Sequence, residues 1–223
     1  RATAGGGGRG IRVLRDDEGL RSAVSSGASE AQSAFGDGRL HIERYVQGAR
    51  HVEVQVLGDR FGHVVDLGER DCSLQFNYQK VLEEAPSPVL SDRQRREICQ
   101  AAVALLQELG YTGAATVEFL WDPVRGEPYF LEVNPRIQVE HPVTEAITGV
   151  DIVAEQIRIA AGERLSFDRA KLNFAGHALQ CRINAQSPRH GLRPAPGRIA
   201  RWSIPSGPNV RVDSHCEVGC VVP

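Results

Sequence analysis

Two strand-like segments with acidic residues at matching positions constrain this chain more than any other feature. Residues 115–121 and 128–134 are rich in apolar and β-branched residues, and Pro and Gly interrupt the sequence between them, so they are expected to form a β-hairpin. Side chains alternate between the faces of a strand, so Glu132 and Asn134 share one face of the second strand. Glu118 lies on the first strand. The hairpin therefore predicts a concentration of oxygen ligands.

The register of this hairpin decides what its carboxylates face. If Leu120 pairs with Phe130, Glu118 stands directly opposite Glu132, where like charges repel unless something compensates them. A divalent cation would do so, since two carboxylates and the Asn134 amide oxygen are hard ligands that suit Mg²⁺. A solvated polar face explains the same pattern, because a shift of one residue moves every side chain to the other face. The pattern alone leaves both interpretations open.

The rest of the chain predicts an α+β fold. Period-two alternation over 40–67, including residues 41–46, predicts consecutive antiparallel strands with a turn at 58–62. Helices are expected over 16–35 and 151–161. Strands and helices in this order favour helices packed on one face of an antiparallel sheet.

A further helix is predicted from its own start and stop signals. Ser91 and Gln94 have the spacing of a capping box, and Gly110 is expected to end the helix. Apolar residues recur on one face of this helix, which should face the core. These residues are Ile98, Ala102, Leu105 and Leu109.

Composition and charge narrow the classes of function. The 26 Lys and Arg residues nearly balance the 28 Asp and Glu residues, for a net charge of -2, which argues against a nucleic-acid binder. The sequence has no apolar run long enough to span a bilayer and no signal peptide, so no membrane role is expected. The 5 Cys residues are scattered without a CxxC pair, which favours reduced thiols in the cytoplasm.

Three other features suggest chemistry, and each has a plainer alternative. Backbone N–H groups of the glycine run 5–10 suit phosphate oxygens, but a flexible linker or a tight turn explains the run equally well. Lys80 is one of two Lys residues and suits a point-charge phosphate binder, unless chance retained it. In the segment 136–145, Arg136 is placed to clamp an oxyanion and Glu140 to accept a proton, although a polar surface loop is the alternative.

Taken together, several stretches resemble the biotin carboxylases, which are ATP-grasp ligases. They cover most of the chain in the family's order, and NPRIQVEHPVTE (134–145) is highly specific. The resemblance implies an ATP-grasp fold of antiparallel sheets with packed helices, followed by the start of a biotin carboxylase C-terminal domain. The stretches are GGGGRG (5–10), IERYV (42–46), RHVEVQVLGD (50–59), ERDCSLQ (69–75), QKVLEEAPSP (79–88), GYTGAATVEFLW (110–121), YFLEVNPRIQVEHPVTE (129–145), TGVDIVAEQIRIAAGE (148–163), GHALQCRINA (176–185) and RPAPGRI (193–199).

The resemblance implies an ATP site with Mg²⁺ or Mn²⁺ beside it. The glycine run, including Gly7 and Gly8, would close over the phosphates of ATP as a lid. The metal ligands would be Glu118 and Glu132, with Asn134 assisting, in agreement with the hairpin argument. The residues that would line the nucleotide are Glu43, Arg44, Tyr45, Val46, His51, Gln75 and Tyr78.

A bicarbonate site is implied next to the nucleotide. Glu140 would be the base that deprotonates bicarbonate, and Arg182 would contact bicarbonate and steady the charge that develops on biotin. The residues that would bind the anion are Lys80, Arg136, Gln138 and Val139.

The implied reaction has two steps. Bicarbonate attacks the γ-phosphate of ATP to give ADP and carboxyphosphate, and the carboxyl group then passes to biotin on a carrier protein. The implied partners, within an acetyl- or acyl-CoA carboxylase, are a biotin carboxyl carrier protein, a second copy in a homodimer and a carboxyltransferase subunit. Two alternatives stay open: a non-catalytic nucleotide-binding remnant of this fold, and an ATP-grasp ligase with another acceptor.

The sequence departs from the family's pattern at two sites. Arg1 stands where the family usually has a phosphate-contacting Lys. Phe76, Asn77 and Tyr78 stand where it usually has two Arg and often a His, so positive charge is lost and the nucleotide contact at Tyr78 stays open.

The chain is expected to be a fragment, since it begins at Arg1 and the family has a domain before the glycine run and a continuation past Pro223. The expected divisions are a lid subdomain at 1–42, an ATP-grasp core at 43–170 and a truncated C-terminal domain at 171–223. Such a fragment is expected to be poorly stable and inactive alone.

Overall fold

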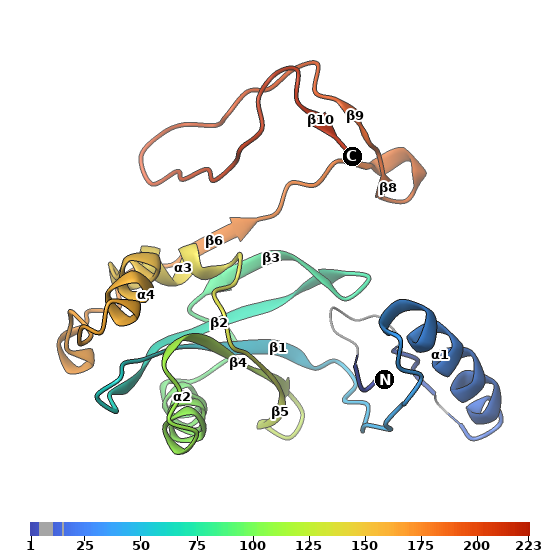
Figure 1. Cartoon of the computed structure of the whole chain (residues 1–223), viewed down its shortest axis with the longest axis horizontal. Coiled ribbons are helices and arrows are strands. Elements are labelled where there is room, and N and C mark those ends of the chain that lie inside the picture. Colours follow the sequence, from blue (N-terminus) through green and yellow to red (C-terminus); the bar gives the residue numbers. More distant parts are fainter. Residues whose placement is uncertain (5–10, 15) are drawn as a thin grey trace. The chain divides into compact units, whose positions relative to one another are not determined.

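The computed structural model describes residues 1–4, 11–14 and 16–223 and consists of two compact units, 1–182 and 183–223 (Figure 1). The expected divisions after residues 42 and 170 stay predictions. Among the described residues, no helix is long and apolar enough to cross a membrane.

The first unit contains most of the regular structure. Its helices are α1 (Leu20–Phe35), α2 (Asp92–Glu108), α3 (His141–Thr148), α4 (Ile152–Ala160) and a short 3₁₀ helix, η1 (Arg169–Lys171). Its strands are β1 (Arg50–Gly58), β2 (Val64–Phe76), β3 (Gln79–Ala85), β4 (Gly113–Asp122), β5 (Glu127–Asn134) and β6 (Ala178–Cys181). The second unit has the 3₁₀ helix η2 (Pro188–His190) and the short strands β7 (Gln186–Ser187), β8 (Arg193–Pro194), β9 (Gly197–Arg198) and β10 (Val221–Val222).

One antiparallel sheet organises the first unit, which confirms the expected α+β class. Its six strands lie in the order β5-β4-β1-β2-β3-β6. The apolar face of β1 and β4 packs against α2, which lies along that face in Figure 1. The opposite face carries polar side chains and, at one end, an apolar cluster in which Leu57, Leu67 and Ala114 pack with Ile152 and Ile159 of α4. Helix α3 packs against β2, β3 and β6.

Helix α2 begins as its sequence signals predict. Ser91 accepts a hydrogen bond from the Gln94 backbone N–H, and the Gln94 side chain accepts one from the Ser91 backbone, which completes the capping box. The predicted apolar face is wrong at its last residue, because Leu109 lies past the last turn and is 67% exposed. The buried residues of this helix are Ile98, Cys99, Ala102 and Leu106.

Two expectations about local structure need correction, and one helix was missed. Residues 41–46 form no strand. Ile42 and Tyr45 are 83% and 61% exposed, so the alternation of polar and apolar residues in this segment marks no buried face. Helix α1 begins at Leu20 rather than at residue 16, with Gly19 as its N-cap. Helix α3 was not expected.

The expected pairing of Glu118 with Glu132 is confirmed, although the pairing of Leu120 with Phe130 from which it was inferred is wrong. Leu120 pairs with Tyr129, not Phe130, in the half of the hairpin nearest the turn. A β-bulge between the Phe119–Phe130 and Glu118–Glu132 pairs then adds one residue on β5. Glu118 therefore lies directly opposite Glu132.

Candidate functional site

A row of charged residues crosses four adjacent strands on the polar face of the sheet. Arg70 of β2 faces Glu53 of β1, Glu53 faces Glu118 of β4, and Glu118 faces Glu132 of β5. Neighbouring strands lie only about 4.8 Å apart, so three adjacent carboxylates repel unless cations approach them.

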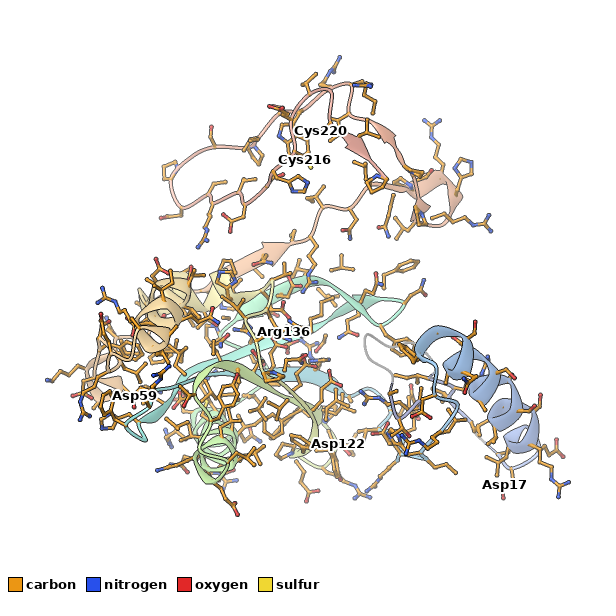
Figure 2. The ribbon with its side chains drawn as sticks, in the orientation of Figure 1. Asp17, Asp59, Asp122, Arg136, Cys216 and Cys220 are labelled. Carbon is orange, nitrogen blue, oxygen red and sulfur yellow. The ribbon has the colours of Figure 1, made fainter. Side chains whose placement is uncertain are left out.

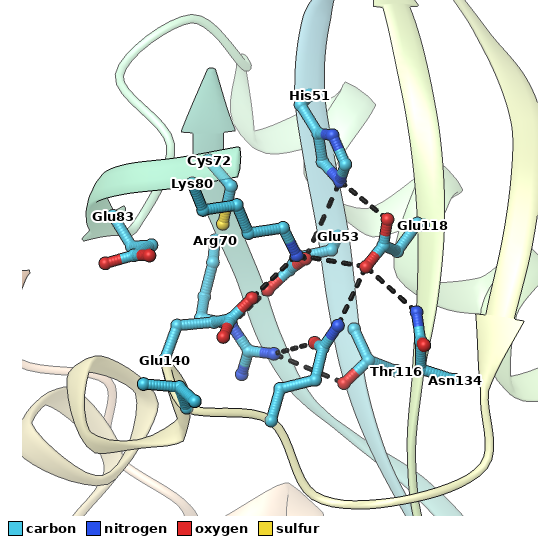
Figure 3. A network of polar contacts seen from close by, with 12 residues as sticks. His51, Glu53, Arg70, Cys72, Lys80, Glu83, Thr116, Glu118, Asn134 and Glu140 are labelled. Atoms are coloured by element: carbon cyan, nitrogen blue, oxygen red, sulfur yellow. Dashed lines mark hydrogen bonds and ion pairs between the residues drawn. The ribbon is translucent and has the colours of Figure 1, made fainter. Parts of the chain in front are cut away.

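Lys80 of β3 supplies much of the compensating charge (Figure 3). Its ammonium donates to Glu118 Oε1 at 3.0 Å, to Glu140 Oε1 at 2.6 Å and to Glu53 Oε2. These three bonds use all the donors of an ammonium group. Burial alone would lower the pKa of Lys80, but Glu53 and the other carboxylates raise it above its ordinary value. Lys80 is therefore held charged.

Arg70 lies at the β2 end of this row and bonds several residues around it. Its side chain is fully buried, and its guanidinium donates to Glu53 Oε1 at 2.7 Å. Four further hydrogen bonds use its remaining donors. They go to Gln55 at 2.8 Å, Thr144 at 3.0 Å, Gln138 at 3.1 Å and Thr116 at 3.2 Å. Arg70 thus ties the sheet to α3 and to the segment that precedes it.

Glu118 is the most densely bonded of the three carboxylates in this row. Besides Lys80, its Oε1 accepts from Gln138 Nε2 at 2.8 Å and from Asn134 Nδ2 at 3.0 Å, while His51 Nε2 lies 2.8 Å from Oε2. Burial would raise the pKa of Glu118, but His51 and Lys80 outweigh it and lower that pKa to about 2. Glu118 is thus an ionised carboxylate at neutral pH, as a metal ligand must be.

The predicted Mg²⁺ ligands lie together, and their chemistry fits the ion. Glu118 and Glu132 face each other, and the Asn134 amide nitrogen lies 3.0 Å and 3.4 Å from one oxygen of each. Rotation of the amide would present its oxygen to a cation between them. Arg1 donates to Glu132 Oε2 at 2.5 Å, so the second carboxylate already has a cationic neighbour. The assignment of these three residues as metal ligands stays a prediction.

Glu140 lies at the start of α3, where two cations meet it. Its Oε1 accepts from Lys80 at 2.6 Å and its Oε2 from the Arg182 guanidinium at 2.8 Å, and only 2% of the residue is exposed. Pro142 in the first turn suits a helix start here. Thr144 lies one turn further on, so it and Glu140 share the face that meets the sheet. A buried carboxylate between two cations can accept a proton once those contacts loosen.

Other residues of the predicted nucleotide and bicarbonate sites lie around this network. Gln75 Nε2 is 3.1 Å from His51 Nδ1, and His51 in turn contacts Glu118, so Gln75 reaches the network through His51. Arg136, labelled in Figure 2, follows β5 and donates to Asn134 Oδ1 at 3.2 Å. Val139 has an exposed side chain, and its carbonyl accepts from Gln180 at 3.2 Å.

The predicted nucleotide residues 43–46 and the predicted lid are less closely joined to this network. Glu43 Oε1 lies 3.8 Å from the Arg1 guanidinium, which also holds Glu132. The Arg44 guanidinium lies 5.5 Å from the Tyr129 ring centroid, and Tyr45 is exposed. The structure places Val46 just before β1, partly buried. Gly7 and Gly8 of the predicted lid fall outside the described residues.

The Tyr78 side chain is 53% exposed and is not part of the buried network. It lies in the turn between β2 and β3, where Asn77 and Tyr78 have φ values of 50° and 60°. These are left-handed values, which a bulky residue rarely adopts. The structure therefore adds no support to the predicted nucleotide contact at Tyr78.

Sequence reasoning missed three charged residues that the structure brings into the network. Glu53, Arg70 and Glu83 are all fully buried. Glu53 and Arg70 do carry a signal, since each is an ionisable residue inside a strand whose other residues are mostly buried. Buried charges of this kind need partners, and a search for opposite charges on neighbouring strands would have paired them.

Comparison with known families decides the relationship. The profile of the carbamoyl-phosphate synthase L chain ATP-binding domain matches residues 1–167, and that of the biotin carboxylase C-terminal domain matches residues 180–223. The chain is 51% identical over its whole length to a biotin carboxylase of Nostoc sp. and 48% identical to biotin carboxylase 1 of Bacillus subtilis. The chain belongs to the biotin carboxylase family. The ATP-grasp resemblance is confirmed with it.

Solved structures of the biotin carboxylase family agree with this fold. The biotin carboxylase domain dimer of Hydrogenobacter thermophilus 2-oxoglutarate carboxylase, in complex with MgADP, ADP and bicarbonate, matches all of the chain with a TM-score of 0.97 and 48% identity. A biotin carboxylase–β,γ-ATP complex from Campylobacter jejuni matches 99% of it with a TM-score of 0.95 and 44% identity. The chain spans 49% of each of those two chains and 50% of the Nostoc and Bacillus proteins.

Proposed function

We propose that this chain carries the central part of an enzyme that carboxylates biotin with bicarbonate and ATP. The observation that supports this most is the position of Glu140, a buried carboxylate between Lys80 and Arg182 and beside the facing pair of Glu118 and Glu132. The arrangement combines a proton acceptor, two anion-binding cations and a pair of metal-type ligands within one network. Relatives named biotin carboxylase support the same function.

In the proposed first step, Lys80 and Arg182 bind bicarbonate through their N–H donors. As the Lys80 ammonium turns from Glu140 to the incoming anion, Oε1 of Glu140 is freed and takes the bicarbonate proton, while Arg182 stays bonded to Oε2. The bicarbonate oxygen then bonds to the γ-phosphorus of ATP while the bond to the β-phosphate oxygen breaks, which yields carboxyphosphate and ADP. Positioning and charge neutralisation dominate such a transfer, and Arg1 adds a cation near Glu132.

The chemistry of Glu118, Glu132 and Asn134 suits Mg²⁺, which when bound would neutralise phosphate charge. A relative's structure is named for MgADP, whereas Mn²⁺ is supported here only by the family resemblance. Among this chain's own residues, Lys80, Gln138 and His51 hold Glu118 in place, and Arg136 contacts Asn134. These contacts orient the ligands before any ion arrives.

The acceptor and partners rest on the family alone. We propose biotin on a carrier protein as the acceptor, with a carboxyltransferase consuming the product and two copies forming a homodimer, as in the dimeric relative. An acetyl- or acyl-CoA carboxylase is the proposed parent, although one relative is a subunit of the pyruvate carboxylase of Methanothermobacter thermautotrophicus. The five unpaired cysteines suit a reducing compartment such as the cytoplasm, and plant relatives are named chloroplastic.

The test is ATP cleavage by the full-length protein that contains this chain. We expect ADP release that requires bicarbonate and rises when free biotin is added. ATP binding without any turnover would contradict the enzyme and favour a non-catalytic remnant, an interpretation that the exposed Tyr78 turn favours. Cleavage that responds to an amine or carboxylate, but not to biotin, would assign another acceptor.

A further inference from the structure

Glu83 is a buried carboxyl group that none of the roles above uses. It lies on β3, where Figure 3 labels it, and it is fully buried. Its Oε1 accepts from Arg182 Nε at 2.6 Å. Its second oxygen, Oε2, has no hydrogen-bond partner among the described residues. A buried carboxylate with one unsatisfied oxygen is costly, so its retention calls for an explanation.

A β-bulge is what turns Glu83 toward the site. In a regular strand, Lys80 and Glu83 would lie on opposite faces because they are three residues apart. Gln75 of β2 pairs with Lys80, but its neighbour Leu74 pairs with Leu82, so Val81 is an extra residue on β3. The bulge shifts the alternation by one residue. Lys80 and Glu83 consequently both meet the cluster around Glu140.

Arg182 spans the two carboxylates with one rigid group. Its Nε donates to Glu83, one terminal nitrogen donates to Glu140 Oε2 at 2.8 Å, and its backbone N–H donates to the Val81 carbonyl at 2.9 Å. A guanidinium is planar, so bonds from two of its nitrogens to separate acceptors fix both its position and its plane. Bonded to Glu140 alone, the long side chain would be free to rotate about that contact.

The electrostatics of Glu83 argue against a purely stabilising role. Burial raises the pKa of Glu83, and the attraction of Arg182 only partly opposes that rise. Glu140 and Glu53 raise it further by repulsion. A buried ion pair of this kind contributes little net stability. What it does contribute is a fixed geometry for Arg182.

We propose that Glu83 is a positioning residue, which holds the Arg182 guanidinium across Glu140 so that its remaining N–H groups face the bicarbonate. The proposal rests on the function proposed above. Glu83 touches neither substrate and acts only through Arg182. Removal of the Glu83 carboxylate should therefore raise the KM for bicarbonate while leaving ATP binding unchanged.

The test compares variants of the full-length protein in the bicarbonate-dependent ATP cleavage assay. Glu83→Gln keeps the volume but removes the charge, and Glu83→Ala removes the contact. Glu84→Gln is the matched control, because Glu84 is the next residue on β3 and its carboxylate meets His177 at 3.0 Å instead. We expect the KM for bicarbonate to rise about tenfold in both Glu83 variants, with the KM for ATP within twofold and Glu84→Gln unchanged.

A double variant separates positioning from a general structural effect. If Glu83 acts through Arg182, the double variant Glu83→Gln/Arg182→Ala should be no worse than Arg182→Ala alone. Additive losses, equal changes in both KM values, or Glu83 variants that match Glu84→Gln would overturn the proposal. So would loss of folding in both Glu83 variants, which would assign Glu83 to the fold. An unsubstituted protein without bicarbonate-dependent cleavage would instead overturn the proposed function, and this inference with it.

Discussion

Glu118 of β4 lies directly opposite Glu132 of β5, and on its other side it faces Glu53 of β1. Three carboxylates in one row would destabilise a sheet if nothing compensated them. Here Lys80 bonds two members of the row and Arg1 bonds the third. Such concentrated charge is typical of sites where anions and cations bind. Substitutions of single charged residues can therefore test the proposed roles.

The metal prediction is tested at Glu132. Replacing Glu132 by Gln removes one of two facing carboxylates, so nucleotide binding should need about tenfold more Mg²⁺. A Mg²⁺ titration of ATP binding by calorimetry measures this. Glu127→Gln, on the exposed first residue of the same strand, is the control and should titrate like the unsubstituted protein. An unaltered titration in Glu132→Gln would remove it from the metal site.

The proposed base is tested at Glu140. Glu140→Gln keeps the shape but cannot take a proton, so carboxylation should fall at least about a hundredfold while ATP binding survives. Product formation and calorimetric ATP binding are measured together. The exposed Glu97→Gln on α2 should retain full activity. If Glu140→Gln turns over at the unsubstituted rate, the proton acceptor lies elsewhere.

The structural importance of Lys80 can be measured against the chain's other lysine. Lys80→Gln would leave Glu53, Glu118 and Glu140 buried without their shared ammonium, and should lower the free energy of unfolding by about 3 kcal/mol. Lys171 is 83% exposed on its side chain, and Lys171→Gln should change that energy by less than about 0.5 kcal/mol. Urea unfolding of the full-length variants measures both. Similar values for the two would show that the Lys80 bonds do not stabilise the fold.

Acid stability should depend on Glu118. Its pKa is lowered from 4.5 to about 2 in the folded chain, so its ionised form stabilises the fold above pH 4.5. That contribution, of about 3 kcal/mol, is lost as the pH falls from about 4.5 to about 2. The difference in free energy of unfolding between the unsubstituted protein and Glu118→Gln should therefore shrink across this window. A difference that stays constant from pH 6 to pH 2.5 would contradict the lowered pKa.

Much of the hairpin and of α2 could be predicted because local rules determine them. The capping box at Ser91 and the facing pair of Glu118 and Glu132 follow from spacing and alternation. The bulges could not be predicted, since an extra residue on one strand has no local sequence mark. Because of the bulge beside Glu118, the pairing of Glu118 with Glu132 is right although the expected pairing of Leu120 with Phe130 is wrong. The bulge at Val81 places Glu83 on the same face as Lys80, which simple alternation along β3 does not predict.

Long-range pairing explains the remaining misses. Arg70 lies in a strand-like segment, and its role emerges only when Glu53, Gln138 and Thr144 come together from β1, the loop after β5 and α3. Helix α3 is short, and the polar residues around it are equally typical of a loop. Residues 41–46 alternate in polarity like a strand, but most of them are exposed and they form no strand. Alternation of polar and apolar residues alone therefore did not identify a strand there.

The proposed reaction requires that an oxygen of bicarbonate attacks the γ-phosphate of ATP. The most direct measurement uses ¹⁸O-labelled bicarbonate with unlabelled water, biotin and the full-length protein, and determines the label in the phosphate released. We expect one ¹⁸O in each phosphate, because the bridging oxygen of carboxyphosphate stays on phosphorus when the carboxyl group is transferred to biotin. Phosphate without label, at an undiminished rate of ATP cleavage, would show that water is the nucleophile and would contradict the proposed reaction.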